Sequence, residues 1–426
     1  MNDHHILLHE PPLSLKHEKL AQLLATEQNI LIVQDLDGVC MGLVKDPLTR
    51  VISLDYVKAT GAFDGHFYVL TNGEHIGKRG VNKIIEKAAG DEAIVKAEGW
   101  YLPGLAAGGV QWQDRYGRVS HPGVSDAELA FLETVPKRIE TAIRQVFDRY
   151  PNALDSNTLE ICIQSAVLDN KASPTANLNA FYERLSDRID IYAALQKRLQ
   201  TLVEELISEA NAQGLNDSFF VHYAPNLGRN DRGLEILRPA KEGDSGTTDF
   251  QFMLRGAIKE AGVLALLNRY YFHRTGTYPL GEDFSVRQAP KTHSELLQLV
   301  ADNFDAEIMP IIIGVGDTVN STAQLEGDRL VVRRGGSDRN FLQLIQDIDK
   351  TFNKGNIVVY IDSSDGEVKN RKPLKLGTDP ETQTTIVLEG PGDPKDTEDP
   401  LILNVVFPGG YQDYTTVFQA AAKERL

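Results

Sequence analysis

Short runs of branched aliphatic residues that end in an acidic or small residue are the feature that most limits how this chain can fold. A strand covered on both faces is apolar along its whole length, so such runs predict buried parallel strands. Amphipathic helical patterns lie beside them at both ends of the chain. This order of strand, helix and strand predicts an α/β fold with a doubly wound parallel sheet. The runs cover residues 30–33, 67–70, 311–313, 357–361 and, as a fifth candidate, 401–407.

The segment between the two ends has a different composition. It contains stretches rich in glycine and aromatic residues, a capping-box helix start at Ser125 and a long amphipathic helix over residues 185–206. The chain has 426 residues, enough for two domains. We therefore predict a core domain made of residues 1–76 and 286–426, and a large inserted α+β cap domain made of residues 77–285.

Composition limits the partners that this chain can bind. It has 44 Lys and Arg against 60 Asp and Glu, so the formal net charge is −16. An acidic surface without a local basic patch repels phosphate backbones and anionic lipid, which argues against nucleic-acid and membrane partners. Two cysteines are too few for a disulfide framework and fit a reducing compartment. Because the N-terminus lacks the apolar core of a signal peptide and no run of about 18 apolar residues occurs, we predict a cytoplasmic protein.

The strongest chemical signal is the sequence Asp-Leu-Asp-Gly-Val at residues 35–39, directly after a predicted strand. Ligands of open α/β sheets bind at the carboxyl ends of the strands. Residues i and i+2 of a chain leaving a strand point the same way, so Asp35 can attack a phosphoryl group while Asp37 acts as acid and base. Two anions that face a phosphate also need a cation, and hard oxygen ligands of this kind favour Mg²⁺.

Two later strand ends add matching groups. Thr71 and Asn72 follow the second predicted strand and supply a hydroxyl and an amide suited to phosphate oxygens. Asp317 supplies a third carboxylate suited to Mg²⁺, after a glycine that permits close backbone approach. Thr-Asn-Gly is by itself a common turn, and only its position after a strand makes it a candidate.

The site also needs a lysine to neutralise the nucleophile and the transferring phosphoryl group. Lys291, in Ala-Pro-Lys-Thr, precedes the strand that leads to Asp317 and is predicted for this role. A Pro-Lys-Thr segment is also an ordinary helix N-terminus, so Lys259 and Arg287 remain alternatives.

In their order, these four motifs resemble those of the haloacid dehalogenase-like phosphatases, with the insertion where such enzymes carry a large cap. More narrowly, residues 33–41 and the chain as a whole resemble the glucosylglycerol-phosphate phosphatases. The resemblance implies a Mg²⁺-dependent phosphatase that acts on a small sugar phosphate through an aspartyl-phosphate. It implies Asp35, Asp317 and the Asp37 backbone carbonyl as metal ligands. It also implies a role in compatible-solute synthesis for salt tolerance and suggests the synthase that makes the substrate as a partner.

Two alternatives stay open. One is a sucrose- or trehalose-phosphate phosphatase with the same chemistry, and the other is a catalytically silent sugar-phosphate binder or regulator. The chain departs from the superfamily pattern at Ser321, which stands where a second acid usually follows the first by four residues. Asp338 is a candidate to fold back and replace the missing charge.

The cap is expected to supply substrate specificity. Trp100 and Trp112 are candidates to stack on a sugar face, and Arg229 and Arg232 are candidates to hold hydroxyls or phosphate. Most such aromatic residues belong to a core, and most arginines on an acidic surface are salt-bridge partners, so structural roles remain the competing interpretation for both pairs.

Overall fold

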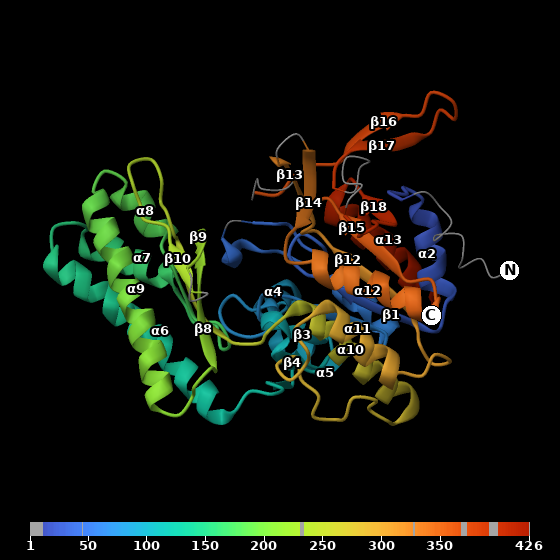
Figure 1. Cartoon of the computed structure of the whole chain (residues 1–426), viewed down its shortest axis with the longest axis horizontal. Helices are drawn as coiled ribbons and strands as arrows, with labels where there is room; N and C mark the ends of the chain where they lie inside the picture. Colours follow the sequence, from blue (N-terminus) through green and yellow to red (C-terminus); the bar gives the residue numbers. More distant parts are fainter. Residues whose placement is uncertain are drawn as a thin grey trace. The chain divides into compact units, whose positions relative to one another are not determined.

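A computed structural model describes residues 12–44, 46–230, 234–326, 329–367, 373–391 and 399–425. The chain forms two compact units. The core unit consists of residues 1–75, 81–123 and 257–426, and the inserted unit (mostly green in Figure 1) consists of residues 76–80 and 124–256.

These bounds differ from the predicted domains. Residues 81–123 and 257–285, which we predicted in the cap, belong to the core unit. The first of these segments extends the core sheet by three short strands, and the second begins with a helix that packs on the sheet. Strands of two or three residues lack the apolar runs that mark the other strands, so the sequence pattern did not reveal them.

The core unit is built on one eight-stranded sheet with the order β18-β15-β12-β1-β2-β3-β4-β5. The strands from β18 to β3 run parallel, whereas β4 and β5 are antiparallel to their neighbours. Every predicted strand is present, although the fifth begins four residues later than its apolar run. The bounds are β1 (Ile30–Gln34), β2 (Phe67–Leu70), β3 (Gly104–Ala106), β4 (Gln111–Gln113), β5 (Val119–Ser120), β12 (Ile311–Gly316), β15 (Ile357–Ile361) and β18 (Val405–Phe407).

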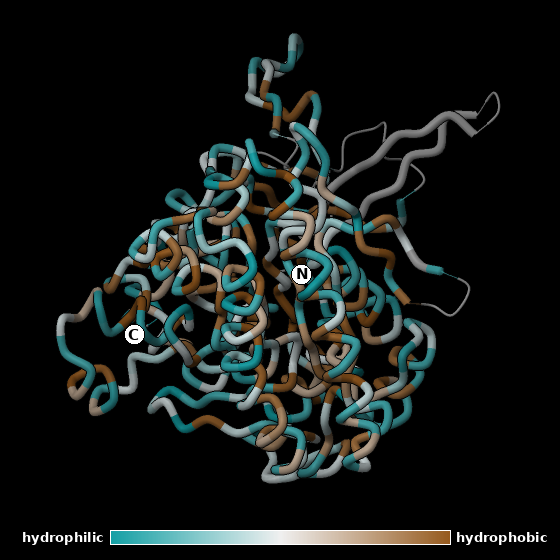
Figure 2. Tube along the Cα trace, turned by 90° about the vertical axis from the view of Figure 1, so that its left-hand side faces the viewer, coloured by the Kyte–Doolittle hydropathy of each residue, from teal (hydrophilic) through white to brown (hydrophobic). Residues whose placement is uncertain are grey.

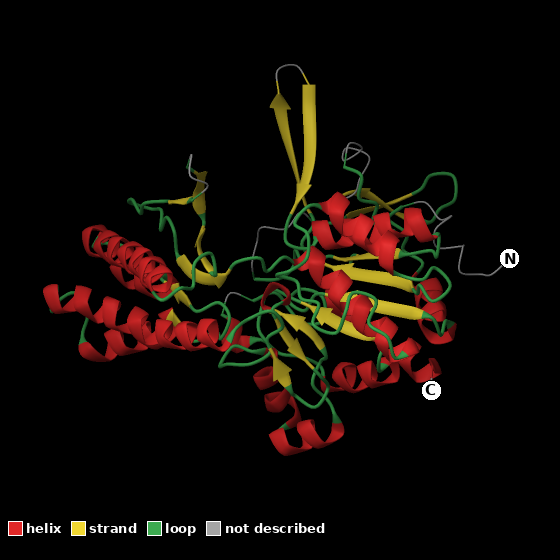
Figure 3. Ribbon diagram, turned by 60° about the horizontal axis from the view of Figure 1, so that its bottom comes forward, coloured by secondary structure: helices red, strands yellow, loops and turns green. Residues whose placement is uncertain are grey.

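Helices cover both faces of this sheet, and Figure 3 shows them in red on either side of the yellow strands. Each face of the sheet carries its own hydrophobic core. Alternate residues of β1 contribute to the two cores, with Ile30 and Ile32 on one face and Leu31 and Val33 on the other. The predicted doubly wound α/β fold is therefore confirmed. The first face holds α2 (His17–Thr26), α3 (Leu54–Ala59), α4 (Val81–Ala89), α5 (Glu92–Glu98) and α13 (Gly410–Arg425); the second holds α10 (Lys259–Thr275), α11 (His293–Asn303) and α12 (Arg339–Phe352).

Two hairpins complete the described part of the core unit. They are β13 (Asn320–Glu326) with β14 (Arg329–Gly335), and β16 (Lys375–Thr378) with β17 (Thr385–Glu389). Figure 2 shows teal and brown alternating along the helices, as expected where each helix buries one face. Among the described residues, no helix is both long enough and apolar enough to cross a membrane.

The inserted unit is α+β, as predicted. Its four-stranded antiparallel sheet has the order β6-β7-β11-β8. The capping box at Ser125 and Glu128 is confirmed, whereas the predicted long helix is interrupted: α8 ends at Leu185 and α9 begins at Ile189. The elements are α6 (Asp126–Arg149), α7 (Ser156–Ala166), β6 (Val167–Leu168), β7 (Thr175–Asn177), α8 (Asn179–Leu185), α9 (Ile189–Ala212), β8 (Phe219–Ala224), β9 (Asn226–Arg229), β10 (Glu235–Leu237) and β11 (Asp249–Leu254).

Candidate active site

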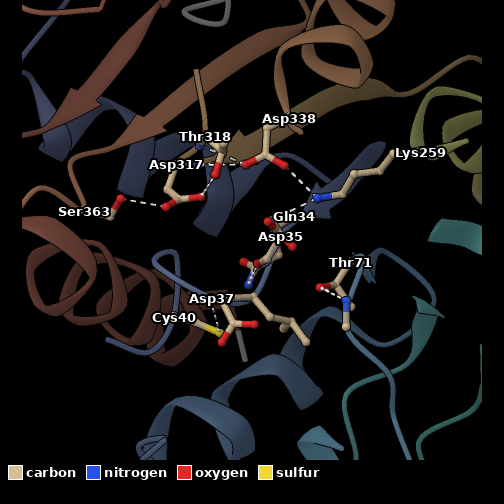
Figure 4. Close-up of polar contacts among 12 residues, drawn as sticks. Gln34, Asp35, Asp37, Cys40, Thr71, Lys259, Asp317, Thr318, Asp338 and Ser363 are labelled. Atoms are coloured by element: carbon tan, nitrogen blue, oxygen red, sulfur yellow. Dashed lines mark hydrogen bonds and ion pairs between the residues drawn. The ribbon is translucent and has the colours of Figure 1, made fainter. Parts of the chain in front are cut away.

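Three buried carboxylates converge at the carboxyl ends of two neighbouring core strands (Figure 4). Asp35 directly follows β1 and Asp317 directly follows β12, which pairs with β1 in parallel. Asp338 immediately precedes α12. Each of the three offers an oxygen within 4.8 Å of the other two.

Asp338 joins the cluster although it lies 21 residues after Asp317. The β13–β14 hairpin leads the chain away from the strand end and back again. Asp338 Oδ2 then accepts hydrogen bonds from the backbone amides of Asp317 at 3.0 Å and Thr318 at 3.1 Å. A Cβ at Gly316 would lie 2.7 Å from that same oxygen, so the close approach requires glycine. Ser321 lies in β13, and its side chain is outside the described part of the structure.

Lys259 is the cation of this cluster. It is the first residue of α10, and its Nζ lies 3.1 Å from Asp35 Oδ2 and 2.6 Å from Asp338 Oδ1. Lys291 Nζ instead donates to the backbone carbonyls of Val286 and Arg287, both at 3.1 Å. The position of Lys259, one of the two alternatives, therefore favours it over Lys291.

The charges in the cluster do not balance. Three ionised carboxylates and one ammonium would leave a net charge of 1 − 3 = −2 in a buried position. Burial, with the carboxylates of Asp338 and Asp317, raises the pKa of Asp35 to about 8, although Lys259 opposes the rise. Asp35 Oδ1 is buried and has no hydrogen-bond partner among the described residues. An excess of buried negative charge of this kind favours a bound cation.

Asp37 has a different environment. Its side chain is one-third exposed, and its Oδ2 lies 3.3 Å from Arg50 Nη1. Burial raises the pKa of Asp37, while Arg50 and Lys259 lower it. A raised pKa suits a carboxyl group that must give and take a proton. Arg50 was not predicted, because it lies in a loop segment after Met41 that contains no recognisable motif.

The hydroxyl groups near the carboxylates also make hydrogen bonds. Thr71 is buried beside β2, and its Oγ1 accepts a hydrogen bond from the Gly73 amide at 3.2 Å, whereas Asn72 is exposed. Ser363, just after β15, donates to Asp317 Oδ2 at 2.6 Å, and Thr318 donates to Asp317 Oδ1 at 2.7 Å. Sequence reasoning missed these last two donors, because a single hydroxyl after a strand is a common turn residue.

Comparison with known proteins gives the family of this chain. A family model described as glucosylglycerol-phosphate phosphatase matches residues 29–422. The chain belongs to this family. A curated glucosylglycerol-phosphate phosphatase from Synechocystis sp. is 59% identical over 420 residues, which cover 99% of each chain. The protein is therefore a phosphatase, that is, a phosphoric monoester hydrolase.

Solved structures show only a distant likeness. The trehalose-6-phosphate phosphatase of Aspergillus fumigatus is 10% identical with a TM-score of 0.38, and the match covers 97% of this chain and all of that one. The C-terminal domain of the Candida albicans enzyme is 10% identical with a TM-score of 0.42, and covers 97% and 99%. Family membership accordingly depends on the sequence relationship.

The structure describes two of the four predicted sugar-binding side chains, those of Trp100 and Trp112. Trp100 and Trp112 both lie in the core unit. Lys58 Nζ lies 4.3 Å from the centroid of the Trp100 ring, and Arg269 Cζ lies 3.8 Å from that of Trp112. One face of each ring is thus occupied by a cation. The Arg229 side chain and the whole of Arg232 lie outside the described residues.

Proposed function

We propose that this phosphatase hydrolyses glucosylglycerol phosphate to glucosylglycerol and phosphate. The observation that carries the choice of substrate is the 59% identity, over 99% of both chains, to a relative named for that activity. The chemistry is supported by the buried cluster at the strand ends, which supplies a carboxylate with an open oxygen beside a lysine.

Asp35 is proposed as the nucleophile. Its carboxylate attacks phosphorus, the bond from phosphorus to the substrate oxygen breaks, and Asp37 gives its proton to that oxygen to release the sugar alcohol. Asp37 then takes a proton from the water that attacks phosphorus in the aspartyl-phosphate. The bond to Asp35 breaks and phosphate leaves. Lys259 and the Thr71 hydroxyl would hold the transferring oxygens, over which the charge is spread.

The cluster fits a Mg²⁺ ion. Buried carboxylates are the hard oxygen ligands that this ion favours, and their excess negative charge calls for a cation. We propose Asp35, Asp317 and the Asp37 backbone carbonyl as ligands, with Asp338 as a further carboxylate close by. When bound, the ion would neutralise charge on the carboxylates and on the phosphoryl group.

We expect purified protein to release phosphate from glucosylglycerol phosphate faster than from sucrose phosphate or trehalose phosphate. Treatment with EDTA should abolish release, and added Mg²⁺ should restore it. The phosphate ester is an anion, and it cannot bind beside the anionic carboxylates unless a cation neutralises part of their charge. Faster release from either disaccharide phosphate would favour that alternative substrate. Saturable sugar-phosphate binding without turnover would favour the silent binder.

Replacing Asp37 with asparagine should separate the two chemical steps. Turnover should fall by about 10² to 10⁴-fold, the usual contribution of a general acid and base. Attack by Asp35 survives in this variant while water activation is lost, so phosphate should accumulate slowly on the protein. Acid-quenched protein incubated with radiolabelled substrate should retain label. The double variant with Asp35→Asn should retain none, and equal label in both would contradict the two assignments.

Several finer assignments remain predictions. The role in salt tolerance and the synthase as partner follow from the family resemblance, and the cytoplasmic location follows from composition and the N-terminal sequence. The supply of sugar specificity was predicted for the cap of residues 77–285.

A further inference from the structure

A buried polar cluster lies on the other face of the core sheet, beneath the nucleophile. Gln34 is the last residue of β1 and has no exposed surface. Its Oε1 accepts hydrogen bonds from the hydroxyl of Tyr56 at 3.0 Å and that of Tyr414 at 2.8 Å. Both tyrosines are buried, one on α3 and the other on α13. One amide oxygen thus receives two hydroxyl donors, which matches its two lone pairs.

The other end of the same amide reaches the nucleophile. Gln34 Nε2 donates to the backbone carbonyl oxygen of Asp35 at 3.2 Å. Only the NH₂ end of the amide can face a carbonyl oxygen, so this contact and the two hydroxyls together determine the orientation of the side chain. The hydrogen bonds therefore run from α3 and α13 through Gln34 to the peptide that leaves Asp35.

The next backbone carbonyl, that of Leu36, accepts hydrogen bonds from the loop that follows β1. Leu36 O accepts hydrogen bonds from the amides of Val39 at 3.1 Å and Cys40 at 3.0 Å, and the Cys40 thiol lies 3.6 Å away. The Asp35 and Leu36 carbonyls are therefore both bonded. The orientation of these two peptides determines where the Asp35 and Asp37 side chains project.

We propose that Gln34 is a positioning residue for Asp35 and that Tyr56 and Tyr414 act through it. This inference assumes the proposed function, because it gives Asp35 a reaction to perform. The Asp35 carboxylate and the Gln34 side chain leave the strand on opposite faces, so the cluster can orient the nucleophile without contacting substrate. It also makes the C-terminal helix α13 a part of the catalytic apparatus.

The test is a set of phenylalanine variants. In Tyr56→Phe with Tyr414→Phe, the amide loses both donors and can rotate, while the ring volumes stay. We expect kcat for phosphate release to fall about 10 to 100-fold, as expected from a small misplacement of a reacting group, with KM within about twofold of wild type. Tyr101→Phe is the matched control. Its buried hydroxyl donates to Glu86 Oε1 at 2.8 Å in the same unit, and its loss should leave kcat unchanged at a similar melting temperature.

A second comparison tests whether the tyrosines act through Gln34. Gln34→Met keeps the approximate shape and removes every hydrogen bond of the amide, so kcat should fall by a similar factor. Adding both tyrosine changes to Gln34→Met should then cost kcat little more, because the three residues act as one unit. Additive losses would overturn the proposal, as would normal kcat in the double phenylalanine variant. If Gln34→Met does not fold, Tyr414→Phe alone must still lower kcat more than Tyr101→Phe does. Failure of the wild-type protein to release phosphate would instead refute the proposed function.

Discussion

Asp35→Asn should lower the turnover of phosphate ester by about four orders of magnitude or more, because the amide cannot attack phosphorus and is a poor metal ligand. The fold should survive this change. Burial, and after it the like charges of Asp338 and Asp317, raise the pKa of Asp35 to about 8, so a neutral side chain of the same shape removes an unfavourable buried charge. In the metal-free protein, the melting temperature should therefore stay equal to that of the wild type or rise.

Asp347 offers a matched control for the nucleophile. It is another buried aspartate of the core unit, but its Oδ2 pairs with His293 Nε2 at 2.8 Å, away from the strand ends. Asp347→Asn should keep nearly full turnover and lose some stability, because the contacts of this carboxylate with His293 and Lys350 are weakened. Near-normal turnover in Asp35→Asn would refute the whole interpretation of the cluster.

Lys259→Met should be the second most damaging change. It leaves Asp35 and Asp338 without their shared cation, so we expect turnover to fall about 10² to 10³-fold, the effect of losing one group that stabilises developing charge. Removing one partner of a buried ion pair also costs about 3 kcal/mol or more, which calorimetry should detect as a lower melting temperature.

Lys291→Met is the matched control for Lys259→Met. The Lys291 ammonium bonds two carbonyls of its own turn, so this variant should keep near-normal turnover. The opposite pattern, with Lys291→Met inactive and Lys259→Met active, would restore the assignment made from the sequence. Steady-state phosphate release by the two variants under the same conditions decides between them.

The sequence was most informative where the signal is local. The buried strands could be predicted because each is a continuous apolar run, and Asp35 and Asp37 could be placed because they directly follow one. Lys259 could not be chosen over Lys291 in the same way. Both stand near a helix start, and only the packing of α10 on the sheet brings one of them to the strand ends.

The domain boundaries failed for a related reason. Strands β3 to β5 are two or three residues long, and β4 and β5 contain polar side chains, so none carries an apolar run that predicts a sheet. Trp100 and Trp112 were therefore assigned to a cap. The structure gives both indoles a cationic neighbour within the core unit, which no local pattern encodes.

The hairpin between Asp317 and Asp338 brings together two residues that lie 21 positions apart in the chain. Its base is closed by the pairing of Asn320 with Gly335 and by hydrogen bonds that the Asp317 and Thr318 amides donate to Asp338 Oδ2. The entropy of closing such a loop grows only slowly with its length, so insertions or deletions at the tip change little at the base. A sequence search that demands a second acid at a fixed interval after Asp317 would therefore miss Asp338. A search of the structure for acids that accept from the Asp317 and Thr318 amides finds it.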